Sequence, residues 1–527
     1  MPEGVVKTNP VPYHRLNSFL SYFRFETTSA MIILVLILMP YLNLFYRFVV
    51  TLVAKNDLPV IFSIRTFKLL GSSLGLSFVV SITSISVAII LLYMLWKIKS
   101  PFSRNMILFI LVFLFCLSPL IQLIGWQRIS FFYTLPPFFC VTLIFTWNLF
   151  PLVLFILISG LMTIDKACIE AGLMICDKKN LIRFIIIPKM LPVILLAGIV
   201  AALLAFVQME VPALLGFTVY SEEFLSRLII EDDLGAAMWL STPFYITGIV
   251  ATGLILFLWP NNSMTTWQKN GLSVLKNVAR PFKHESLVSL FVIIILCIPI
   301  FLLLMGVYSV NWVDFFLNNY LAIYSSFKLA VLGVLIAIPA AYLIVDGLTL
   351  LRRKYLILAL GLFCMLVLLP GSLLGLGMQD VSQYTGFLWF KNGDLLLIFT
   401  HSIKILPYGV LLFFGFKWLD HSSQGDDVFM PGISWIHRKR FIDLPNEIHR
   451  IITISGILFV ITLSEVSTTI LVISPGTQTI ILKLYNLLHY GAYDTVIALA
   501  LVQAGIVLVL MAALYRFVRR NTHDSYE

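Results

Sequence analysis

The sequence predicts an all-α polytopic membrane protein, with about 12 transmembrane helices arranged as two homologous six-helix halves. Composition is the first reason. Of the 527 residues, 60% are hydrophobic and only 12% are charged, against about 45–50% and about 25% in soluble domains. The second reason is a series of long apolar windows, and the third is a set of markers that recur at a near-constant spacing. A soluble or disordered chain is excluded, and the alternating segments of roughly 10 residues typical of a membrane β-barrel are not found.

Apolar windows long enough to cross a bilayer occur six times in each half. In the first half they cover residues 30–50, 71–96, 105–125, 138–161, 191–209 and 236–259, and in the second half 286–308, 325–345, 355–377, 395–416, 451–473 and 494–515. Four prolines lie inside these windows, where neighbouring helices can satisfy the carbonyls that they free: Pro40, Pro119, Pro151 and Pro407. The first window is too long for a signal-peptide core, so we expect an uncleaved first span.

The charges predict the orientation. The net charge is +10, and such a surplus in a membrane protein lies in cytoplasmic loops rather than on a nucleic-acid-binding face. With the N-terminus inside, Lys and Arg gather in the predicted inner segments, around residues 97–104, 166–189, 269–283, 352–354, 417–450 and 516–520. We therefore expect both termini in the cytoplasm. The polar, basic segment 260–285 is the predicted linker between a first half, 1–259, and a second half, 286–527.

The two halves share markers at matching positions. Pro151 lies 19 residues before Glu170, and Pro407 lies 19 residues before Asp426. Pro188 and Pro445 end the loops that follow, and "MEVPALLG" (209–216) corresponds to "SEVSTTIL" (464–471). The four offsets are 256, 256, 257 and 255 residues. This regularity indicates a duplicated architecture whose halves enter the membrane in the same orientation.

Each half has one long inner loop between its fourth and fifth windows, residues 164–192 and 419–450. Each loop begins with acidic residues, continues with basic and apolar residues, and ends at a proline. A short helix with this charge order suits the helix dipole. Its apolar positions need a cover, which is either lipid or a partner protein.

These loops resemble the EAA motif of ABC-importer permeases, Glu-Ala-Ala-x3-Gly-x9-Ile-x-Leu-Pro. In the first loop Glu170 and Ala171 match, Gly172 replaces the second alanine, Cys176 replaces the glycine, and Pro188 comes one residue early. The second loop fits without a gap: Asp426 stands at the glutamate, Asp427 and Val428 at the alanines and Gly432 at the glycine, and Ile442, Leu444 and Pro445 complete the motif. The alternative for Glu170 and Asp426 is a pair of solvated loop acids.

The segment 464–491, "SEVSTTILVISPGTQTIILKLYNLLHYG", is similar to the second half of ferric-iron-type importer permeases, which also fuse two halves in one chain. The resemblance implies the type I ABC importer permease fold in a bacterial inner membrane. It implies that each loop is a coupling helix docked on a dimer of separate ATP-binding subunits. A periplasmic or lipid-anchored binding protein then delivers the substrate, with ferric iron as the leading cargo and thiamine, phosphonate or polyamine as alternatives.

The chain itself is not expected to be an enzyme. No GxxxxGK[ST] phosphate-binding loop occurs in it, so ATP hydrolysis belongs to partner subunits. The glycine-rich run at residues 371–377 lies inside a window and lacks the lysine, which favours helix packing. The six cysteines form no CxxC pair, so we expect neither disulfides nor metal clusters. We expect no resident metal and no cofactor.

Four polar residues are candidates for the translocation pathway: Glu210, Glu465, His401 and Lys404. The two glutamates occupy matching places toward the outer ends of the fifth and eleventh windows, and carboxylates at membrane depth usually face a cavity. A structural pair at a helix end is the alternative. His401 and Lys404 are three residues apart and share a helix face, so they either line the pathway or form a buried ion pair. The first half has Trp147 and Asn148 at the corresponding stretch.

Two other classes of protein are alternatives. An ion-coupled secondary transporter would also have twelve spans in two halves, and the two glutamates would suit it, but it would not need the matching amphipathic loops. An integral-membrane enzyme would need clustered His, Asp or Glu at one membrane face, whereas the eight histidines are scattered.

Overall fold

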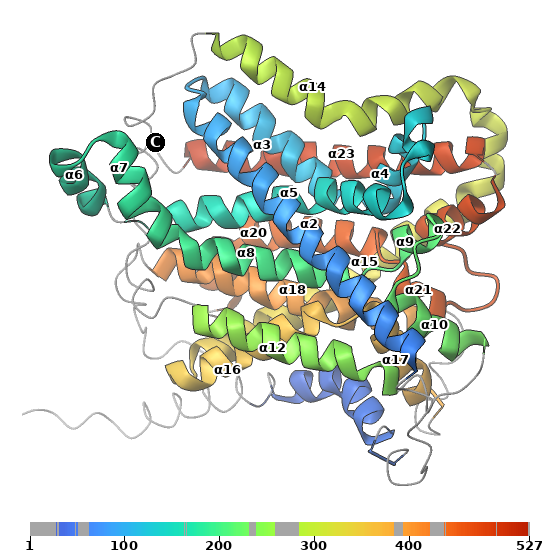
Figure 1. Cartoon of the computed structure of the whole chain (residues 1–527). Coiled ribbons are helices and arrows are strands. Elements are labelled where there is room, and N and C mark those ends of the chain that lie inside the picture. Colours follow the sequence, from blue (N-terminus) through green and yellow to red (C-terminus); the bar gives the residue numbers. More distant parts are fainter. Residues whose placement is uncertain are drawn as a thin grey trace, which may run out of the picture.

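The computed structural model describes Thr28 and residues 31–47, 49–50, 63–162, 164, 166–230, 239–258, 284–383, 394–421, 437, 439–491 and 493–524. The predicted linker, up to residue 283, lies outside these ranges, and so do Asp426, Asp427 and Gly432. Within the described ranges every element is helical (Figure 1).

The described part of the chain contains eight helices long and apolar enough to cross a membrane, or up to ten if each bent pair is one span. A helix lies at each of the twelve predicted windows. The long ones are α2 (Ile64–Lys97), α5 (Pro137–Met162), α8 (Ile187–Val207), α14 (Glu285–Leu304), α15 (Trp312–Thr349), α18 (Leu395–His421), α20 (Leu444–Leu463) and α23 (Tyr493–Asp524). The helix Met31–Arg47 and α12 (Thr242–Leu258) are shorter.

Two helix pairs bend sharply in the middle of the bundle. α3 (Pro101–Cys116) meets α4 (Pro119–Trp126) at 102°, and α16 (Arg353–Leu368) meets α17 (Gly371–Val381) at 94°. A proline disfavours the α conformation in the residue before it, and Ser118 and Leu369 accordingly have ψ angles of 140° and 141°. The window around Pro119 was expected to be one helix; the proline ends the first helix instead.

Shorter helices connect the long ones. In the first part of the chain they are η1 (Ser130–Thr134), α6 (Lys166–Ile175), α7 (Lys178–Leu181), η2 (Ile182–Ile186), α9 (Glu210–Leu214) and α10 (Tyr220–Ile230). Later they are η4 (Met305–Ser309), η6 (Lys439–Asp443), α21 (Ser467–Val472) and α22 (Ile480–Tyr490). Both η2 and η6 are π-helical turns that lead into a helix with proline in its first turn. Proline cannot donate the regular hydrogen bond, which favours a wider turn before it.

The helix Met31–Arg47 packs far from its sequence neighbours. Its residues Ile37, Tyr41 and Leu44 belong to one buried cluster with side chains of α15 to α20, and Arg47 Nε donates to Asp380 Oδ2 of α17 at 2.6 Å. In turn, α14 covers α3 and α4 (Figure 1), and the carboxylate of Glu285 accepts from the backbone N–H of Ser100. Each of these two helices therefore docks on the other part of the chain.

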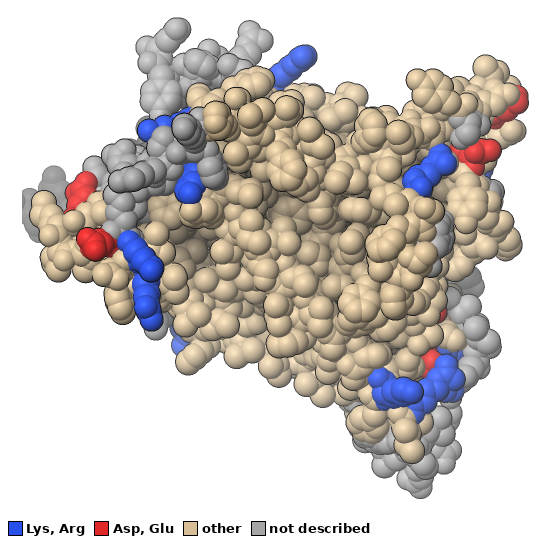
Figure 2. Space-filling model, turned by 45° about the horizontal axis from the view of Figure 1, so that its top comes forward, with Lys and Arg blue, Asp and Glu red and all other residues tan. Residues whose placement is uncertain are grey.

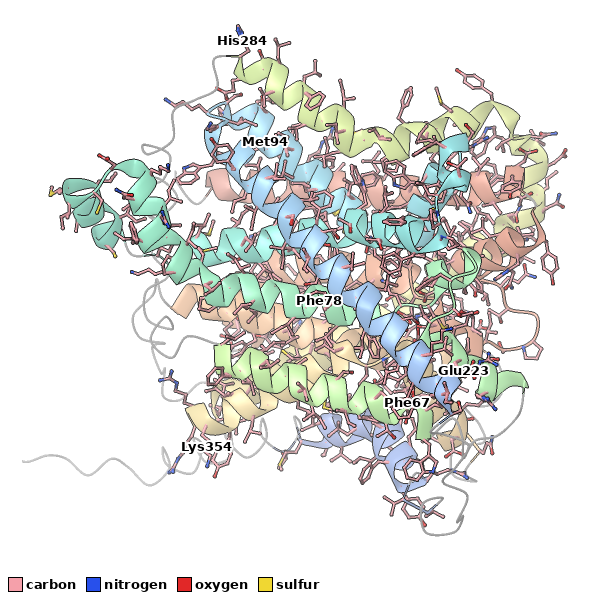
Figure 3. All side chains as sticks on the ribbon, in the orientation of Figure 1. Phe67, Phe78, Met94, Glu223, His284 and Lys354 are labelled. Atoms are coloured by element: carbon pink, nitrogen blue, oxygen red, sulfur yellow. The ribbon has the colours of Figure 1, made fainter. Side chains whose placement is uncertain are left out.

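Charged side chains lie toward the ends of the bundle, and a broad uncharged surface separates them (Figure 2). We call the end where α2 finishes and α16 begins the basic end; Met94, His284 and Lys354 lie toward it, and Phe67 and Glu223 toward the opposite end (Figure 3). The basic end carries Lys97, Lys99, Arg104, Arg183, Arg352, Arg353, Lys354, Lys417, Arg450 and Arg516. This distribution is that of a membrane-spanning protein.

Candidate functional site

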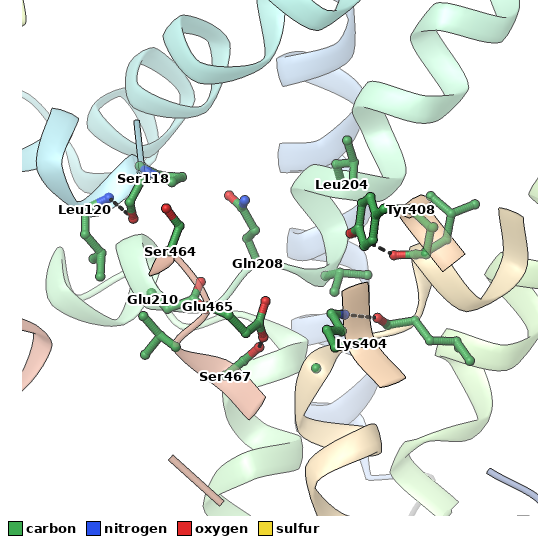
Figure 4. A pocket seen from close by; sticks show the side chains of 17 residues that line it. Ser118, Leu120, Leu204, Gln208, Glu210, Lys404, Tyr408, Ser464, Glu465 and Ser467 are labelled. Atoms are coloured by element: carbon green, nitrogen blue, oxygen red, sulfur yellow. Dashed lines mark hydrogen bonds between the residues drawn. The ribbon is translucent and has the colours of Figure 1, made fainter. Parts of the chain in front are cut away.

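A cavity of about 120 Å³ lies inside the bundle, where both bent pairs break and where α8 and α20 end. Three of the four predicted pathway residues line it, namely Glu210, Glu465 and Lys404 (Figure 4). Its full lining is Ser118, Pro119, Leu120, Leu204, Val207, Gln208, Glu210, Val367, Leu368, Leu369, Gly371, Lys404, Tyr408, Ser464, Glu465, Val466 and Ser467. Segments about 250 residues apart in the sequence thus form one polar site.

The two glutamates reach the cavity from helix breaks. α8 ends at Val207, Gln208 is extended with φ −73° and ψ 134°, and α9 begins at Glu210. α20 ends at Leu463 and α21 begins at Ser467, which leaves Glu465 in the short connection between them. Backbone that departs from the helix at membrane depth is stable only where it is buried in protein or lines a cavity. Both breaks meet that condition.

The Glu465 carboxylate is held on one side. Its Oε1 accepts from Ser467 Oγ at 2.8 Å, from Thr468 Oγ1 at 2.7 Å and from the Thr468 backbone N–H at 3.2 Å. All three bonds fall on that oxygen, and the other oxygen points into the cavity (Figure 4). Gly371, the first residue of α17, approaches so closely that a Cβ there would overlap Oε1 and lie 2.5 Å from Ser467 Oγ. Glycine is required at this position for the carboxylate to keep its place.

Lys404 faces the glutamates from α18 on the other side of the cavity (Figure 4). The side chain is 7% exposed, and its Nζ donates to the carbonyl oxygen of Leu369 at 3.1 Å. That carbonyl is the one released where α16 breaks before Pro370. The lysine therefore satisfies a helix end and places a positive charge opposite two carboxylates.

His401 lies one turn from Lys404 and is not part of the cavity lining. It is buried, and its Nε2 lies 3.1 Å from Thr469 Oγ1 of α21. This contact joins α18 to α21. Among the described residues no group of three or more His, Cys, Asp or Glu could hold a metal ion.

Two lining residues escaped the sequence prediction. Gln208 Oε1 and Ser464 Oγ are buried atoms that accept or donate no hydrogen bond among the described residues. They stand 256 residues apart, the same offset as the other markers, so the repeat could have identified them. Each chain segment thus supplies one carboxylate and one unpaired neutral oxygen to the cavity.

Acidic and phenolic groups lie between the cavity and the end opposite the basic end. Burial, followed by the charges of Glu210 and Glu222, raises the pKa of Tyr485 in α22 to about 12. Ser221 Oγ donates to the Gln208 carbonyl oxygen at 3.4 Å. α9, α10 and α22 therefore bring acidic and phenolic groups close to one another on this side of the cavity.

The first predicted docking loop projects from the bundle at the basic end as α6 and α7 (Figure 1). Glu170 and Ala171 are exposed on α6, whereas Gly172 is buried, and a Cβ there would lie 2.5 Å from Leu181 Cδ1. Cys176 ends α6 with its N–H bonded to the Gly172 carbonyl at 2.8 Å. Met174 and Ile175 are 89% and 83% exposed.

The prolines that end the two predicted loops have the same local structure. Pro188 stands in the first turn of α8 after η2, and Pro445 stands in the first turn of α20 after η6, preceded by Leu444. Ile442 lies within η6, whereas Asp426, Asp427, Val428 and Gly432 of the second loop lie outside the described ranges.

Comparison with known proteins finds no matching family model, no matching curated protein and no matching solved structure. The class of protein is therefore defined by its own features. It is an all-helical membrane-spanning protein with a charged cavity at the meeting point of its helix breaks.

Proposed function

We propose that the chain is the membrane-spanning permease subunit of an ABC importer in a bacterial inner membrane. It comprises two homologous six-helix halves with both termini in the cytoplasm, and each bent pair counts as one span. It moves substrate, with ferric iron as the leading cargo, from a periplasmic or lipid-anchored binding protein to the cytoplasm by alternating access. Separate ATP-binding subunits supply the energy. Thiamine, phosphonate or polyamine are the alternative cargoes of the same class.

The order of elements supports the two halves. A long helix, a bent pair, a second long helix, a π-helical turn, a third long helix and a short helix follow one another as α2 to α9, and again as α15 to α21. Individual contacts recur too. The backbone N–H of Tyr220 at the start of α10 donates to Ser73 Oγ at 2.8 Å, and that of Ile480 at the start of α22 donates to Ser326 Oγ at 2.7 Å.

The docking of the first helix of each half also recurs. Gly125 of α4 lies against the backbone of Pro299 in α14, and Gly377 of α17 lies against the backbone of Pro40. Both glycines stand in the second arm of a bent pair, 252 residues apart. Such exchange ties the two halves together, so that one rearrangement moves both.

The observation that carries the proposal is the exposed apolar tip of α6. Met174 and Ile175 are almost fully exposed beyond the basic end, in the loop whose sequence resembles an EAA motif. Large exposed apolar side chains at the tip of a projecting helix need a cover, which is either lipid or a partner protein. An ATP-binding subunit at the cytoplasmic face is the partner that the motif implies, and its closure would be transmitted through η2 into α8, which ends at the cavity.

The cavity supports a cationic cargo. Two carboxylates, the amide oxygen of Gln208 and the hydroxyl of Ser464 line it, and hard cations prefer oxygen ligands. In this mechanism substrate reaches the cavity from the end that carries α10 and α22. It leaves toward the basic end after the ATP-binding subunits reopen.

The test is co-purification of ATP-binding subunits with the tagged chain from its native membrane. Wild type is compared with Met174→Glu combined with Ile175→Glu, and Tyr490→Glu is the matched control, because Tyr490 is 85% exposed at the opposite end. Loss of two buried apolar side chains costs about 3 kcal/mol, roughly a hundredfold in Kd. We expect the subunit with wild type and the control and its loss from the double variant. Equal recovery with the double variant, or none with wild type, contradicts the proposal.

An ion-coupled secondary transporter is the second candidate, since Glu210 and Glu465 share a buried cavity. It would need no partner on α6. Uptake by the purified chain alone in vesicles, driven by a proton or sodium gradient, would establish this class instead.

A further inference from the structure

The positive charge of Lys404 exceeds what its structural contact requires. Asn148 of α5 donates to the carbonyl oxygen of Leu117, the residue that ends α3, at 3.0 Å. Lys404 of α18 donates to the carbonyl oxygen of Leu369, the residue that ends α16, at 3.1 Å. The two side chains make equivalent hydrogen bonds at the two helix breaks, and Asn148 makes its bond with a neutral amide.

The positive charge of Lys404 therefore has a second interaction partner. Lys404 lines the same cavity as Glu210 and Glu465, and it lies across from them (Figure 4). Lys404 is only 7% exposed, and a buried charge is costly unless it is compensated. One lysine lies opposite two carboxyl groups, so the site carries an excess negative charge whenever both of them are ionised.

The cavity has room for a ligand beside the lysine. Its volume is about 120 Å³, while one water needs roughly 10–15 Å³. Gln208 and Ser464, whose Oε1 and Oγ have no hydrogen bond among the described residues, line this space together with Glu465. Four oxygen-bearing side chains, contributed in matching pairs from the α8 and α20 breaks, line this cavity, and oxygen is the ligand atom that hard cations prefer.

We propose that Lys404 is a resident counter-ion of a multivalent-cation site formed by Glu210, Glu465, Gln208 and Ser464, and that the transported cation displaces its charge. The inference rests on the proposed transport function and names the role of a residue within it. An arriving multivalent cation competes with the ammonium for the same carboxylates. After release the ammonium neutralises them again, so the emptied site does not hold the cation back.

The counter-ion role predicts that removing the charge of Lys404 strengthens cation binding. Lys404→Asn introduces the residue that stands at the corresponding position of the other half, Asn148, and removes the competing charge. Affinity for a multivalent cation then rises, by tenfold or more, and release slows. If the lysine instead held an anionic group of the cargo, the same change would weaken binding. Lys404→Arg keeps the charge and should leave affinity within a few-fold of wild type.

The experiment measures equilibrium binding of Fe³⁺, supplied as its nitrilotriacetate complex, to the purified full chain in lipid nanodiscs. Wild type, Lys404→Asn, Lys404→Arg and Glu465→Gln are compared after each has given a single size-exclusion peak. Tighter binding by Lys404→Asn and loss of binding in Glu465→Gln support the inference. Unchanged or weaker binding by Lys404→Asn overturns it, and so does the absence of Fe³⁺ binding to wild type. The co-purification experiment is independent of these results, so a failure of the counter-ion role and a failure of the importer proposal are distinguishable.

Discussion

Gly125 lies against α14, and Gly377 lies against the helix Met31–Arg47. Replacing these glycines with alanine tests the docking of the two helices directly. A Cβ at Gly377 would lie 2.7 Å from the backbone oxygen and 3.0 Å from the backbone carbon of Pro40. A Cβ at Gly125 would come closer still to the backbone oxygen of Pro299 and lie 3.0 Å from its carbon. Ordinary contacts begin near 3.4 Å. A backbone atom cannot rotate away, so the helices must separate.

The expected loss follows from this geometry. Overpacking a tight contact costs about 1–3 kcal/mol, and both substitutions should fall in this range, with Gly125→Ala the more destabilising. Gly253→Ala is the matched control, because it adds the same methyl group to an exposed position of α12 with nothing within 4 Å. Alanine favours the helix, so this control should match wild type or exceed it slightly.

The assay is thermal unfolding in detergent, followed with a dye that fluoresces on reaction with thiols. Cys116, Cys140, Cys297 and Cys364 are free and wholly or partly buried, so unfolding exposes them. Both glycine variants should unfold at lower temperatures than the control. If Gly125→Ala and Gly377→Ala unfold at the wild-type temperature, the close docking of the exchanged helices is wrong.

Two further ion pairs give separate predictions. Lys417 Nζ forms an ion pair with the buried Asp346 at 2.9 Å. Asp346→Asn should therefore lower the free energy of unfolding by about 2 kcal/mol, because a partly buried ammonium is left without this carboxylate. Adding Lys417→Gln should recover part of that free energy, and purely additive effects in the double variant would contradict the coupling. At the opposite end the hydrogen bond from Lys328, followed by that from Thr477, lowers the pKa of Asp394. A lowered folded-state pKa stabilises the protein above the unfolded value of about 3.9 and loses that effect as pH falls through the folded pKa. The gap in unfolding temperature between wild type and Asp394→Asn should therefore be constant near pH 6 and close toward pH 3, and a gap independent of pH would refute this.

Hydropathy predicted where the helices lie, but not where they break. Pro119 and Pro151 both lie in apolar windows, yet Pro151 continues α5 while Pro119 begins a new helix after a 102° bend. The difference depends on a partner for the carbonyl that the break releases, which Asn148 supplies to Leu117. Such a partner comes from another helix, so the local sequence does not contain it.

The charged members of the site were predictable and the neutral ones were not. Glu210, Glu465 and Lys404 stand out because charges are rare in apolar windows. Gln208 and Ser464 are ordinary polar residues, and only their spacing marks them. The contact that His401 makes could not be predicted, because its partner Thr469 lies on another helix. The importer function itself stays a prediction.

The docking of the helix Met31–Arg47 on α17 has a consequence for biosynthesis. Arg47 binds Asp380, which lies 333 residues later in the chain. At a synthesis rate of about 5–20 residues per second, the helix Met31–Arg47 waits roughly 20 to 70 s in the membrane before its docking surface on α17 emerges. The helix α14 has no such delay, because α3 and α4 are made before it. During that interval Asn43 and Arg47 lack the carboxylate that they bind in the finished fold, so this helix completes its docking only after α17 is made.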